Sequence, residues 1–423
     1  MSAPVIGFAG MTHLGLVSGV SAAEKGFRVV CHDPDAARIA ALARGELPVS
    51  EPRLDELRAK NAARLAFSAD AAALAGCDVI YVAPDVPTDD QGRSDIAPIE
   101  AMLERVFAAS RKDAVVVVLS QVAPGYTRAR QRPGRVLHYQ VETLIFGRAV
   151  ERALQPERYI VGCADPAQPL PAPYRAFLEA HGCPILPMRY ESAELAKISI
   201  NFFLVSTVTT TNVLAEVCEA IGADWSEIAP ALRLDRRIGP HAYLAPGLGI
   251  AGGNLERDLA TVLRIAEERD TDANVVEAWI ADSRYRRDWA LRALRREVLA
   301  RGGDPVVAVL GLAYKQDTHS TKNSPSIALL AALGDARVRV YDPVVPATAA
   351  PNPRRHGAAS ALEACDGADA LAVMTPWPQF AKLPAKELAA RLRGKLVLDP
   401  YGVLDGPACR AAGLIYRRMG APA

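Results

Sequence analysis

The sequence lacks the cysteine patterns of disulfide-rich and zinc-binding proteins. Its seven cysteines form no Cys-x-x-Cys pair, and no cysteine or histidine stands at the spacing of metal ligands. An odd, dispersed set of cysteines is typical of free thiols in a reducing compartment, so we expect a cytoplasmic protein without disulfides or a structural metal. The seven are Cys31, Cys77, Cys163, Cys183, Cys218, Cys365 and Cys409.

Long hydrophobic runs and an excess of either charge are also missing. The longest apolar runs, such as Ala114–Leu119, are far too short to cross a bilayer. The 49 basic and 48 acidic side chains give a net charge of +1, which favours neither a nucleic-acid nor a membrane partner. Several arginines between residues 284 and 296 fall in a helical pattern, and we interpret them as a solvated helix face.

A chain of 423 residues exceeds the size at which one hydrophobic core stops growing, so we expect two or three domains. In the first part, short apolar runs alternate with amphipathic helical stretches, which indicates a parallel sheet covered on both faces. The expected strands are Val5–Ala9, Phe27–Cys31, Asp78–Ala83 and Ala114–Ser120. The expected helices are Gly15–Lys25, Asp35–Arg44, Arg53–Lys60 and Ile99–Ala109.

From about Glu191 the strand pattern stops and helical periodicity replaces it. Ala193–Gly222 is long enough for a central helix, and a second helical tract runs from Arg257 to Arg301 with one break. Gly302–Pro305 has the composition of a turn, and strand–helix alternation resumes after it. The strands expected there are Val306–Leu310, Arg337–Tyr341, Ala370–Met374 and Lys395–Asp399.

This order predicts an α/β protein with two Rossmann-like doubly wound parallel-sheet domains joined by a central all-α region. We place the first domain at residues 1–190, the helical region at residues 191–302 and the last domain at residues 303–423. The similar alternation at both ends raises the possibility that the two end domains share a fold.

A glycine-bearing segment between the first expected strand and helix indicates a dinucleotide site. Amides at such a helix start can bind a pyrophosphate, and Asp33, which follows the second strand, can accept hydrogen bonds from ribose hydroxyls. An acid there favours NAD over NADP. Thr12 departs from the pattern because it replaces the second glycine, and a turn without a ligand is the alternative. The predicted cofactor segment is Gly10, Met11, Thr12, His13, Leu14 and Gly15.

Several further segments, in this order and at this spacing, resemble the UDP-glucose/GDP-mannose 6-dehydrogenase family across nearly the whole chain. The resemblance implies an NAD-dependent enzyme that acts on a nucleotide sugar, with an active site in the cleft between the two α/β domains and dimerisation through the helical region. The matching segments are Glu51–Leu54, Pro87–Thr88, Ser192–Asn201, Asp235–Gly239, Pro246–Gly253, Gly311–Lys315, Ser324–Pro325 and Tyr341–Pro343.

The family oxidises a primary alcohol to an acid in two hydride transfers, and the resemblance assigns one set of residues to the reacting oxygen. These are Lys197, Asn201 and Asp258. Lys197 and Asn201 are four residues apart, which places them on one helix face. A lysine ammonium can stabilise a developing alkoxide, and an aspartate can orient or deprotonate a water.

A second set of residues, which serves the thioester half of the family reaction, is replaced. By register, Asn254 occupies the position of the catalytic cysteine, and no cysteine lies between Cys218 and Cys365. An amide is not a nucleophile under these conditions, so the thioester route is closed. Gln121 stands where the family has threonine, a position we assign to the cofactor side. Of the family's two glutamates, Glu142 is kept and Phe146 replaces the other.

The resemblance also assigns residues to the nucleotide end of the substrate. Glycines of the loop, Gly249 and Gly252 among them, follow Tyr243 and suit backbone contacts to a diphosphate. Arg237 is the candidate clamp for the sugar or phosphate, and Lys315 the candidate contact of the last domain. Lys322, assigned to the cofactor, stands where the family has arginine, so a bidentate contact there becomes a point charge.

Three functions remain open at this stage. The retained oxygen-holding set and the lost thioester set favour a two-electron reaction that gives a carbonyl product or assists an isomerisation. Full oxidation to the uronic acid through an unassisted hydrate is the second possibility. A non-catalytic protein that binds NAD and a nucleotide sugar, most readily a UDP-sugar, is the third.

Overall fold

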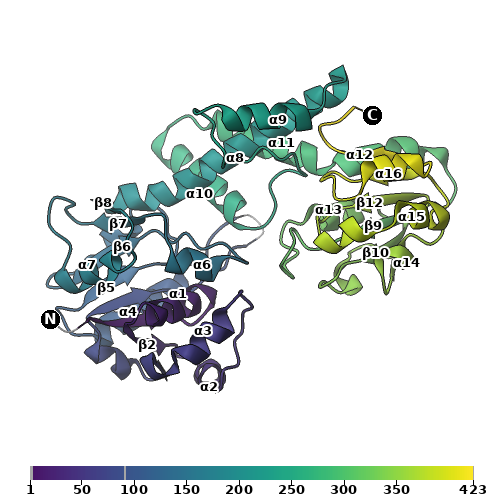
Figure 1. Ribbon diagram of the computed structural model, residues 1–423. Coiled ribbons are helices and arrows are strands. Elements are labelled where there is room, and N and C mark those ends of the chain that lie inside the picture. The colour runs from purple at the N-terminus through teal and green to yellow at the C-terminus, as the bar shows by residue number, and fades with distance from the viewer. Residues whose placement is uncertain (1–2, 90–91, 423) are drawn as a thin grey trace. The chain divides into compact units, whose positions relative to one another are not determined.

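The computed structural model describes residues 3–89 and 92–422, and the chain divides into two compact units, residues 1–200 and 201–423 (Figure 1). Because the positions of the units relative to one another are not determined, each unit is described by itself. The long helix α8 (Tyr190–Ile221) contains the division.

The first unit is built on an eight-stranded sheet with the order β3-β2-β1-β4-β5-β6-β7-β8. All neighbouring strands are parallel except β6 and β7, which are antiparallel. The strands are β1 (Val5–Ala9), β2 (Arg28–His32), β3 (Leu65–Ser68), β4 (Val79–Val82), β5 (Val115–Val118), β6 (Val136–Gln140), β7 (Tyr159–Cys163) and β8 (Ile185–Arg189). The helices are α1 (His13–Glu24), α2 (Ala36–Arg44), α3 (Leu54–Lys60), α4 (Ala97–Ala109), α5 (Tyr126–Ala129), α6 (Ala149–Leu154) and α7 (Ala172–Glu179).

Helices cover both faces of this sheet, as the continuous apolar strands predict. Alternate residues of β4 point to opposite faces, so Tyr81 packs in one hydrophobic cluster with α1 and α7, while Ile80 and Val82 pack in the other with α4. The four strands predicted for this region are confirmed with small shifts at their ends. The remaining four were not predicted: β3 and β8 are partly buried edge strands, β6 carries His138 and Gln140, and β7 is a short buried strand that sequence reasoning missed.

The helical region begins at Tyr190, directly after β8 and close to the start predicted at about Glu191. Its helices are α8, α9 (Trp225–Leu234), α10 (Asn254–Arg269), α11 (Asn274–Arg287) and α12 (Trp289–Glu297). The predicted break in the second helical tract is the segment between α10 and α11. Contrary to the expectation from the short apolar runs, α8 is long and apolar enough to cross a membrane by length and composition alone, and 28% of its most apolar window is buried within the structure.

The interpretation of the arginines on α11 and α12 as a solvated face is wrong for Arg286. Its side chain is fully buried and forms ion pairs with Glu216 at 3.1 Å and Glu219 at 3.0 Å. Both carboxylates come from α8, one turn apart, so the arginine joins α11 to α8. Glu219 also accepts hydrogen bonds from the indole of Trp289 and from the backbone N–H of Gly420, which ties the end of the chain to the same helices.

The C-terminal part of the second unit has a six-stranded parallel sheet with the order β11-β10-β9-β12-β13-β14. Its first five positions repeat the order of β3-β2-β1-β4-β5, so the two sheets share a Rossmann-like topology. The strands are β9 (Val306–Leu310), β10 (Arg337–Tyr341), β11 (Arg355–Gly357), β12 (Ala370–Val373), β13 (Leu396–Leu398) and β14 (Ile415–Arg417). The helices are α13 (Pro325–Ala332), α14 (Ala361–Ala364), α15 (Ala385–Arg391) and α16 (Gly406–Ala411).

Candidate active site

The glycine segment of the first unit forms a tight turn between β1 and α1. Gly10 has a φ of +102°, and a Cβ there would lie 2.6 Å from the backbone nitrogen of Pro84. Its N–H donates to the carbonyl oxygen of His32 at 2.8 Å. Gly15 lies in the first turn of α1 against the carbonyl oxygen of Gly10, where a Cβ would be only 1.9 Å away. The turn therefore has room for backbone alone and opens the start of α1 at the carboxyl edge of the sheet.

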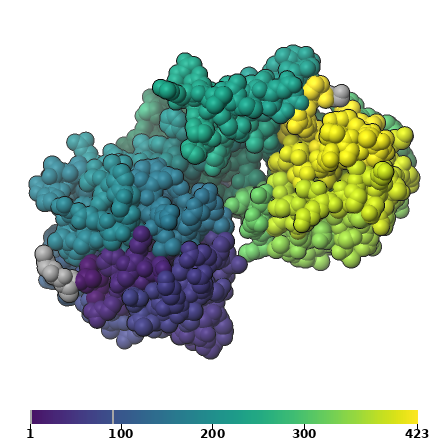
Figure 2. All heavy atoms as spheres, in the orientation of Figure 1, coloured from purple at the N-terminus to yellow at the C-terminus, as the bar shows by residue number. Residues whose placement is uncertain are grey.

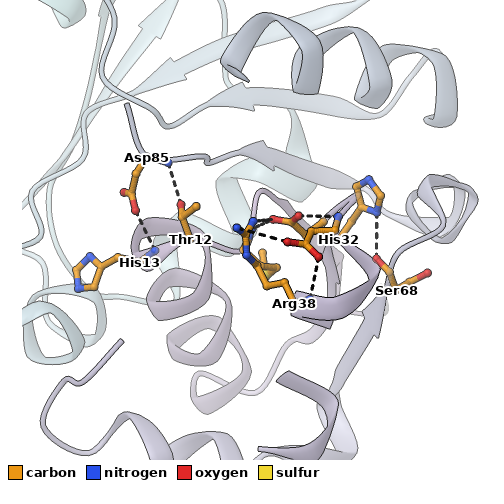
Figure 3. Close-up of polar contacts among 9 residues, drawn as sticks. Thr12, His13, His32, Arg38, Ser68 and Asp85 are labelled. Atoms are coloured by element: carbon orange, nitrogen blue, oxygen red, sulfur yellow. Dashed lines mark hydrogen bonds and ion pairs between the residues drawn. The ribbon is translucent and has the colours of Figure 1, made fainter. Parts of the chain in front are cut away.

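Asp33, at the end of β2, is buried and already makes several contacts. Its Oδ2 accepts from the backbone N–H of Met11 at 2.8 Å and from the guanidinium of Arg38 at 2.8 Å. Its Oδ1 accepts from the N–H of Asp35 at 3.0 Å. A carboxylate oxygen can accept two hydrogen bonds, so Oδ1 can still accept one from a ribose hydroxyl. Arg38 comes from α2 and is labelled in Figure 3.

The start of α1 is formed by the cap residue Thr12 and the first helical residues His13 and Leu14. The carboxylate of Asp85, which the sequence did not indicate, lies against this start. Asp85 follows β4, and its Oδ2 accepts from the N–H of His13 at 2.9 Å, while its own N–H donates to Thr12 Oγ1 at 2.8 Å (Figure 3). Asp85 is exposed as a residue, but its carboxylate faces the helix. Loss of solvent there raises the pKa of Asp85, and hydrogen bonds from Thr12, His13 and Leu14 oppose that rise.

The imidazole of His13 connects this turn to the loop after β6. Its Nε2 lies 2.8 Å from Oε1 of Glu51, which is 5% exposed. The same carboxylate accepts from the backbone N–H groups of Gly147 and Ala149. Phe146, which replaces a family glutamate, stacks on His13 with ring centroids 4.2 Å apart. A buried carboxylate with three donors fixes the loop, so Glu51 positions both the cofactor turn and residues 142–149.

Two residues assigned to the chemistry meet in the first unit. Lys197, in the second turn of α8, lies with its Nζ 3.5 Å from Oε2 of Glu142, which follows β6. Both side chains are mostly buried. Gln121 stands after β5, at the same carboxyl edge of the sheet as the glycine turn. This arrangement keeps an ammonium and a carboxylate close together at the edge where Rossmann-like domains bind their ligands.

The other two oxygen-holding residues meet in the second unit. Asn201 Nδ2 donates to Oδ2 of Asp258, which is 1% exposed and also accepts from Arg257 Nε at 3.4 Å. Asn201 lies one helical turn after Lys197 on α8, as predicted. Asn254 is the exposed first residue of the 16-residue helix α10, so its amide projects where the partial positive charge of the helix start acts.

The predicted substrate loop is anchored at both ends. The carbonyl oxygen of Tyr243 accepts from Thr211 Oγ1 on α8 at 3.1 Å, and its ring is half exposed. At the other end, the N–H of Gly252 donates to the carbonyl oxygen of Lys322, and its own carbonyl accepts from Asn323 Nδ2 at 2.8 Å. Gly249 packs against Ser283 between these anchors. The loop is thus held by α8 and by the segment that precedes α13.

Arg237 does not meet these residues within the second unit. Its side chain is 90% exposed and forms an ion pair with Asp235 at 2.7 Å, two residues earlier. Lys315 lies in the loop after β9, with its Nζ 5.8 Å from the ring centroid of Tyr314. In that loop the N–H of Leu312 donates to Oδ2 of Asp342, which ends β10. Asp342 therefore occupies the position in this domain that Asp33 occupies in the first.

Four residues with evident local roles were missed by sequence reasoning or not given a role: Asp85, Glu51, Arg38 and Asp342. Glu51 and Asp342 lie in segments that carried the resemblance, so their position was marked but their partners were not. Asp85 follows a predicted buried strand at the carboxyl edge of a parallel sheet, which is a usable signal. Among the described residues, no group of three or more histidine, cysteine, aspartate or glutamate side chains could hold a metal ion.

Three family models match the chain in order. They are the UDP-glucose/GDP-mannose dehydrogenase NAD binding domain at residues 5–170, the central domain at residues 191–282 and the UDP binding domain at residues 308–406. The chain belongs to this family. The predictions of the family, of an NAD-dependent dehydrogenase and of two Rossmann-like sheets joined by a central helical region are confirmed. The glycine turn, which brings the first amides of α1 to the carboxyl edge of the sheet, and the acceptor site left on Asp33 fit the dinucleotide.

Individual relatives are similar over the full length. UDP-glucose 6-dehydrogenases of Pseudomonas aeruginosa and Rhizobium meliloti are each 31% identical, with 98% of this chain covered and 96% and 98% of the relatives. A UDP-glucose dehydrogenase structure from Pyrobaculum islandicum is 26% identical, covers 100% of this chain and 98% of its own, and superimposes with a TM-score of 0.85.

Proposed function

We propose that this family member oxidises one CH–OH group of a nucleotide sugar with NAD and releases a carbonyl product. The observation that carries the proposal is Asn254, which begins α10 at the position that the register assigns to the catalytic cysteine. Without a thiol the carbonyl carbon forms no thiohemiacetal, so the second hydride transfer has no activated donor. The reaction then stops after two electrons.

The first half of the reaction uses the two retained pairs. NAD, held by the glycine turn and Asp33, would supply the acceptor for the hydride of the alcohol carbon. Lys197, kept close to Glu142, stabilises the negative charge that develops on the alcohol oxygen. Asp258, with Asn201 as its hydrogen-bond donor, takes the hydroxyl proton directly or through a water. Loss of one hydride and one proton balances the conversion of the alcohol to the carbonyl.

The residues that stand at the positions of the acid-forming half explain why the reaction ends at the carbonyl. Asn254 can donate a hydrogen bond to a carbonyl oxygen, and the start of α10 favours negative charge on that oxygen, but neither forms a covalent adduct. Phe146 is occupied by its stack on His13 and has no group that could activate a water. Gln121 likewise replaces a hydroxyl with an amide. These three changes all remove functions of the acid-forming half.

For the substrate we propose a UDP-sugar, since the C-terminal domain matches the family's UDP binding domain. Lys315 contacts the nucleotide phosphates, and the loop with Gly249 and Gly252 supplies backbone amides. Tyr243 and Arg237, which the resemblance assigns to the substrate, have side chains exposed to solvent. Lys322, next to the anchor of Gly252, is assigned to NAD as a point charge.

We also propose that the protein is a cytoplasmic homodimer. Helix α8 exposes several large apolar side chains, and Figure 2 draws the surface of this part of the chain in teal. Contiguous exposed apolar residues mark interaction surfaces, and a second copy of the same helix covers them symmetrically. They are Phe203, Val213, Leu214, Val217 and Ile221. The seven cysteines, all free, suit a reducing compartment.

The variant Lys197→Ala separates an enzyme from a non-catalytic binder. Loss of a charge-stabilising ammonium should reduce turnover by about 10²-fold or more, while binding of NAD and the UDP-sugar stays nearly unchanged. NADH formation with a panel of UDP-sugars measures turnover, and calorimetric titration measures binding. If the unmodified protein binds both ligands but forms no NADH with any sugar, and Lys197→Ala behaves identically, the protein is a binder and the enzymatic proposal is wrong.

A further inference from the structure

The start of α1 is already in contact with a negative charge from its own chain. Asp85 Oδ2 accepts from the backbone N–H of His13 at 2.9 Å. Thr12 Oγ1 accepts from the N–H of Asp85 at 2.8 Å, which holds the loop after β4 against the turn (Figure 3). These contacts lie wholly within the first unit.

A carboxylate in this position competes with a pyrophosphate for the same donors. The first amides of a helix have no partner within the helix, and together with the helix dipole they attract an anion. In a dinucleotide-binding turn that anion is the pyrophosphate. A second anion at the same amides is repelled by the first, and the repulsion is strong at a separation of a few ångströms.

We propose that Asp85 occupies the pyrophosphate position of the cofactor-free protein, and that NAD binds only when this carboxylate turns away from the N–H of His13. The inference rests on the assignment of the NAD pyrophosphate to the start of α1, and not on the identity of the sugar or the number of hydrides transferred. Asp85 is able to leave, because it is exposed and follows the last buried residue of its strand segment, Pro84. The aspartate therefore lowers the affinity for NAD while it stabilises the free protein.

The alternative role of an aspartate at this place has the opposite sign. If Asp85 accepted a hydrogen bond from a ribose hydroxyl of bound NAD, removal of its charge would weaken binding. The comparison of Asp85→Asn with Asp85→Ala uses this difference. The asparagine keeps an oxygen that can accept from His13 and removes only the charge, whereas the alanine removes the charge and the hydrogen bond.

The decisive measurement is the dissociation constant for NAD by calorimetric titration in the absence of sugar. Removal of the charge should tighten binding by about tenfold in Asp85→Asn, the scale of one partly screened charge pair. Asp85→Ala should bind NAD at least as tightly, and its melting temperature without NAD should fall because the start of α1 loses its acceptor. Inorganic pyrophosphate, titrated in place of NAD, should show the same order of affinities.

Asp165→Asn is the matched control, because it removes one negative charge and one carboxylate that accepts a backbone N–H, that of Ala167, from the same unit. Its NAD affinity should equal that of the unmodified protein. Weaker NAD binding in Asp85→Asn would overturn the inference. An affinity that changes by less than about twofold would also overturn it, because loss of a charge pair predicts a change of about tenfold. Because no sugar is present, the outcome is independent of whether the proposed two-electron oxidation is correct.

Discussion

In both Rossmann-like domains the turn after the first strand is held by the same kinds of hydrogen bonds. In the first unit, the N–H of Gly10 donates to the carbonyl of His32 at 2.8 Å, and the N–H of Met11 donates to Asp33 at 2.8 Å. The glycine is required because Pro84, which comes after the neighbouring strand, leaves no room for a Cβ.

The C-terminal domain repeats these contacts almost one for one. The N–H of Gly311 donates to the carbonyl of Tyr341 at 2.8 Å, and the N–H of Leu312 donates to Asp342 at 2.6 Å. Gly311 has a φ of +92°, and a Cβ there would lie 2.4 Å from the Cβ of Thr375, which comes after β12. The acid in each domain holds the turn by accepting from a backbone N–H.

The two domains differ in the segment after the turn. In the first, α1 begins at His13, so helix amides stand at the edge of the sheet. In the second, α13 begins only at Pro325, and the intervening loop carries Lys315 and Lys322. One fold can therefore offer a phosphate either backbone amides with a helix dipole or, in our proposal, the ammonium group of Lys315, while Lys322 stays assigned to NAD. We accordingly propose that the first turn takes a dinucleotide and the second a nucleotide diphosphate.

Replacing the glycine of either turn by alanine should have the largest effect on ligand affinity. Gly10→Ala places a Cβ against the backbone of Pro84, and the forced displacement should weaken NAD binding by about 100-fold, as misplacement by roughly 1 Å does at other sites. UDP binding should be unaffected. Gly311→Ala, which meets Thr375, should do the reverse. Calorimetric titration of each variant with NAD and with UDP makes the comparison.

Circular dichroism and melting curves show whether each variant is folded, and only folded variants enter the comparison. The two turns would not be separate binding sites if either variant lost both ligands to the same extent.

A smaller effect tests the use of lysine by the second turn. Lys315→Met keeps the length of the side chain and removes its charge, so UDP affinity should fall by about tenfold and its dependence on salt should weaken. NAD affinity should not change. Lys382→Met is a control, since Lys382 lies in the 3-10 helix Pro378–Lys382 of the same domain. UDP affinity that is unchanged in Lys315→Met would remove the lysine from the site.

The smallest expected effect distinguishes the roles of the two turn acids, Asp33 and Asp342. Asp33→Asn should reduce the preference for NAD over NADP by about fivefold, because the repulsion of a 2′-phosphate is lost while Arg38 remains beside the site. Asp342 accepts hydrogen bonds from Leu312, Ala313 and the indole of Trp377, so Asp342→Asn should lower the melting temperature and leave that preference unchanged. Competition of NADP with NAD measures the first, and a thermal shift the second.

Sequence reasoning found the turn at Gly10 and the buried strands because both depend on local signals, while the segment of Gly311 was marked by the resemblance alone. Gly10 and Gly311 each come directly after an apolar strand, and β5 is an uninterrupted run of buried valines. The resemblance supplied Lys197 and Asn201, which no periodicity would have separated from an exposed helix face. Their partners on other elements, Glu142 and Asp258, are now seen within hydrogen-bond reach.

Contacts between distant elements could not be predicted. The arginine at 286 looked like its exposed neighbours, since nothing local shows that two glutamates of α8 surround it. The carboxylate of Asp85 meets His13 across 72 residues of sequence, through the adjacency of β1 and β4 in the sheet. Phe146 was recognised as a lost glutamate, but its stack on His13 is visible only in the structure.

The proposed function depends on one replacement, that of a thiol by Asn254, which ends the reaction at a carbonyl. The most direct test is the ratio of NADH formed to UDP-sugar consumed, together with the mass of the product, for the unmodified protein and for Asn254→Cys. We predict one NADH per sugar and a product lighter by two hydrogens from the unmodified protein. Asn254→Cys should give at most a covalent adduct on the protein, since Gln121 and Phe146 leave its hydrolysis unassisted. Two NADH per sugar and an acid product from the unmodified protein would contradict this proposal.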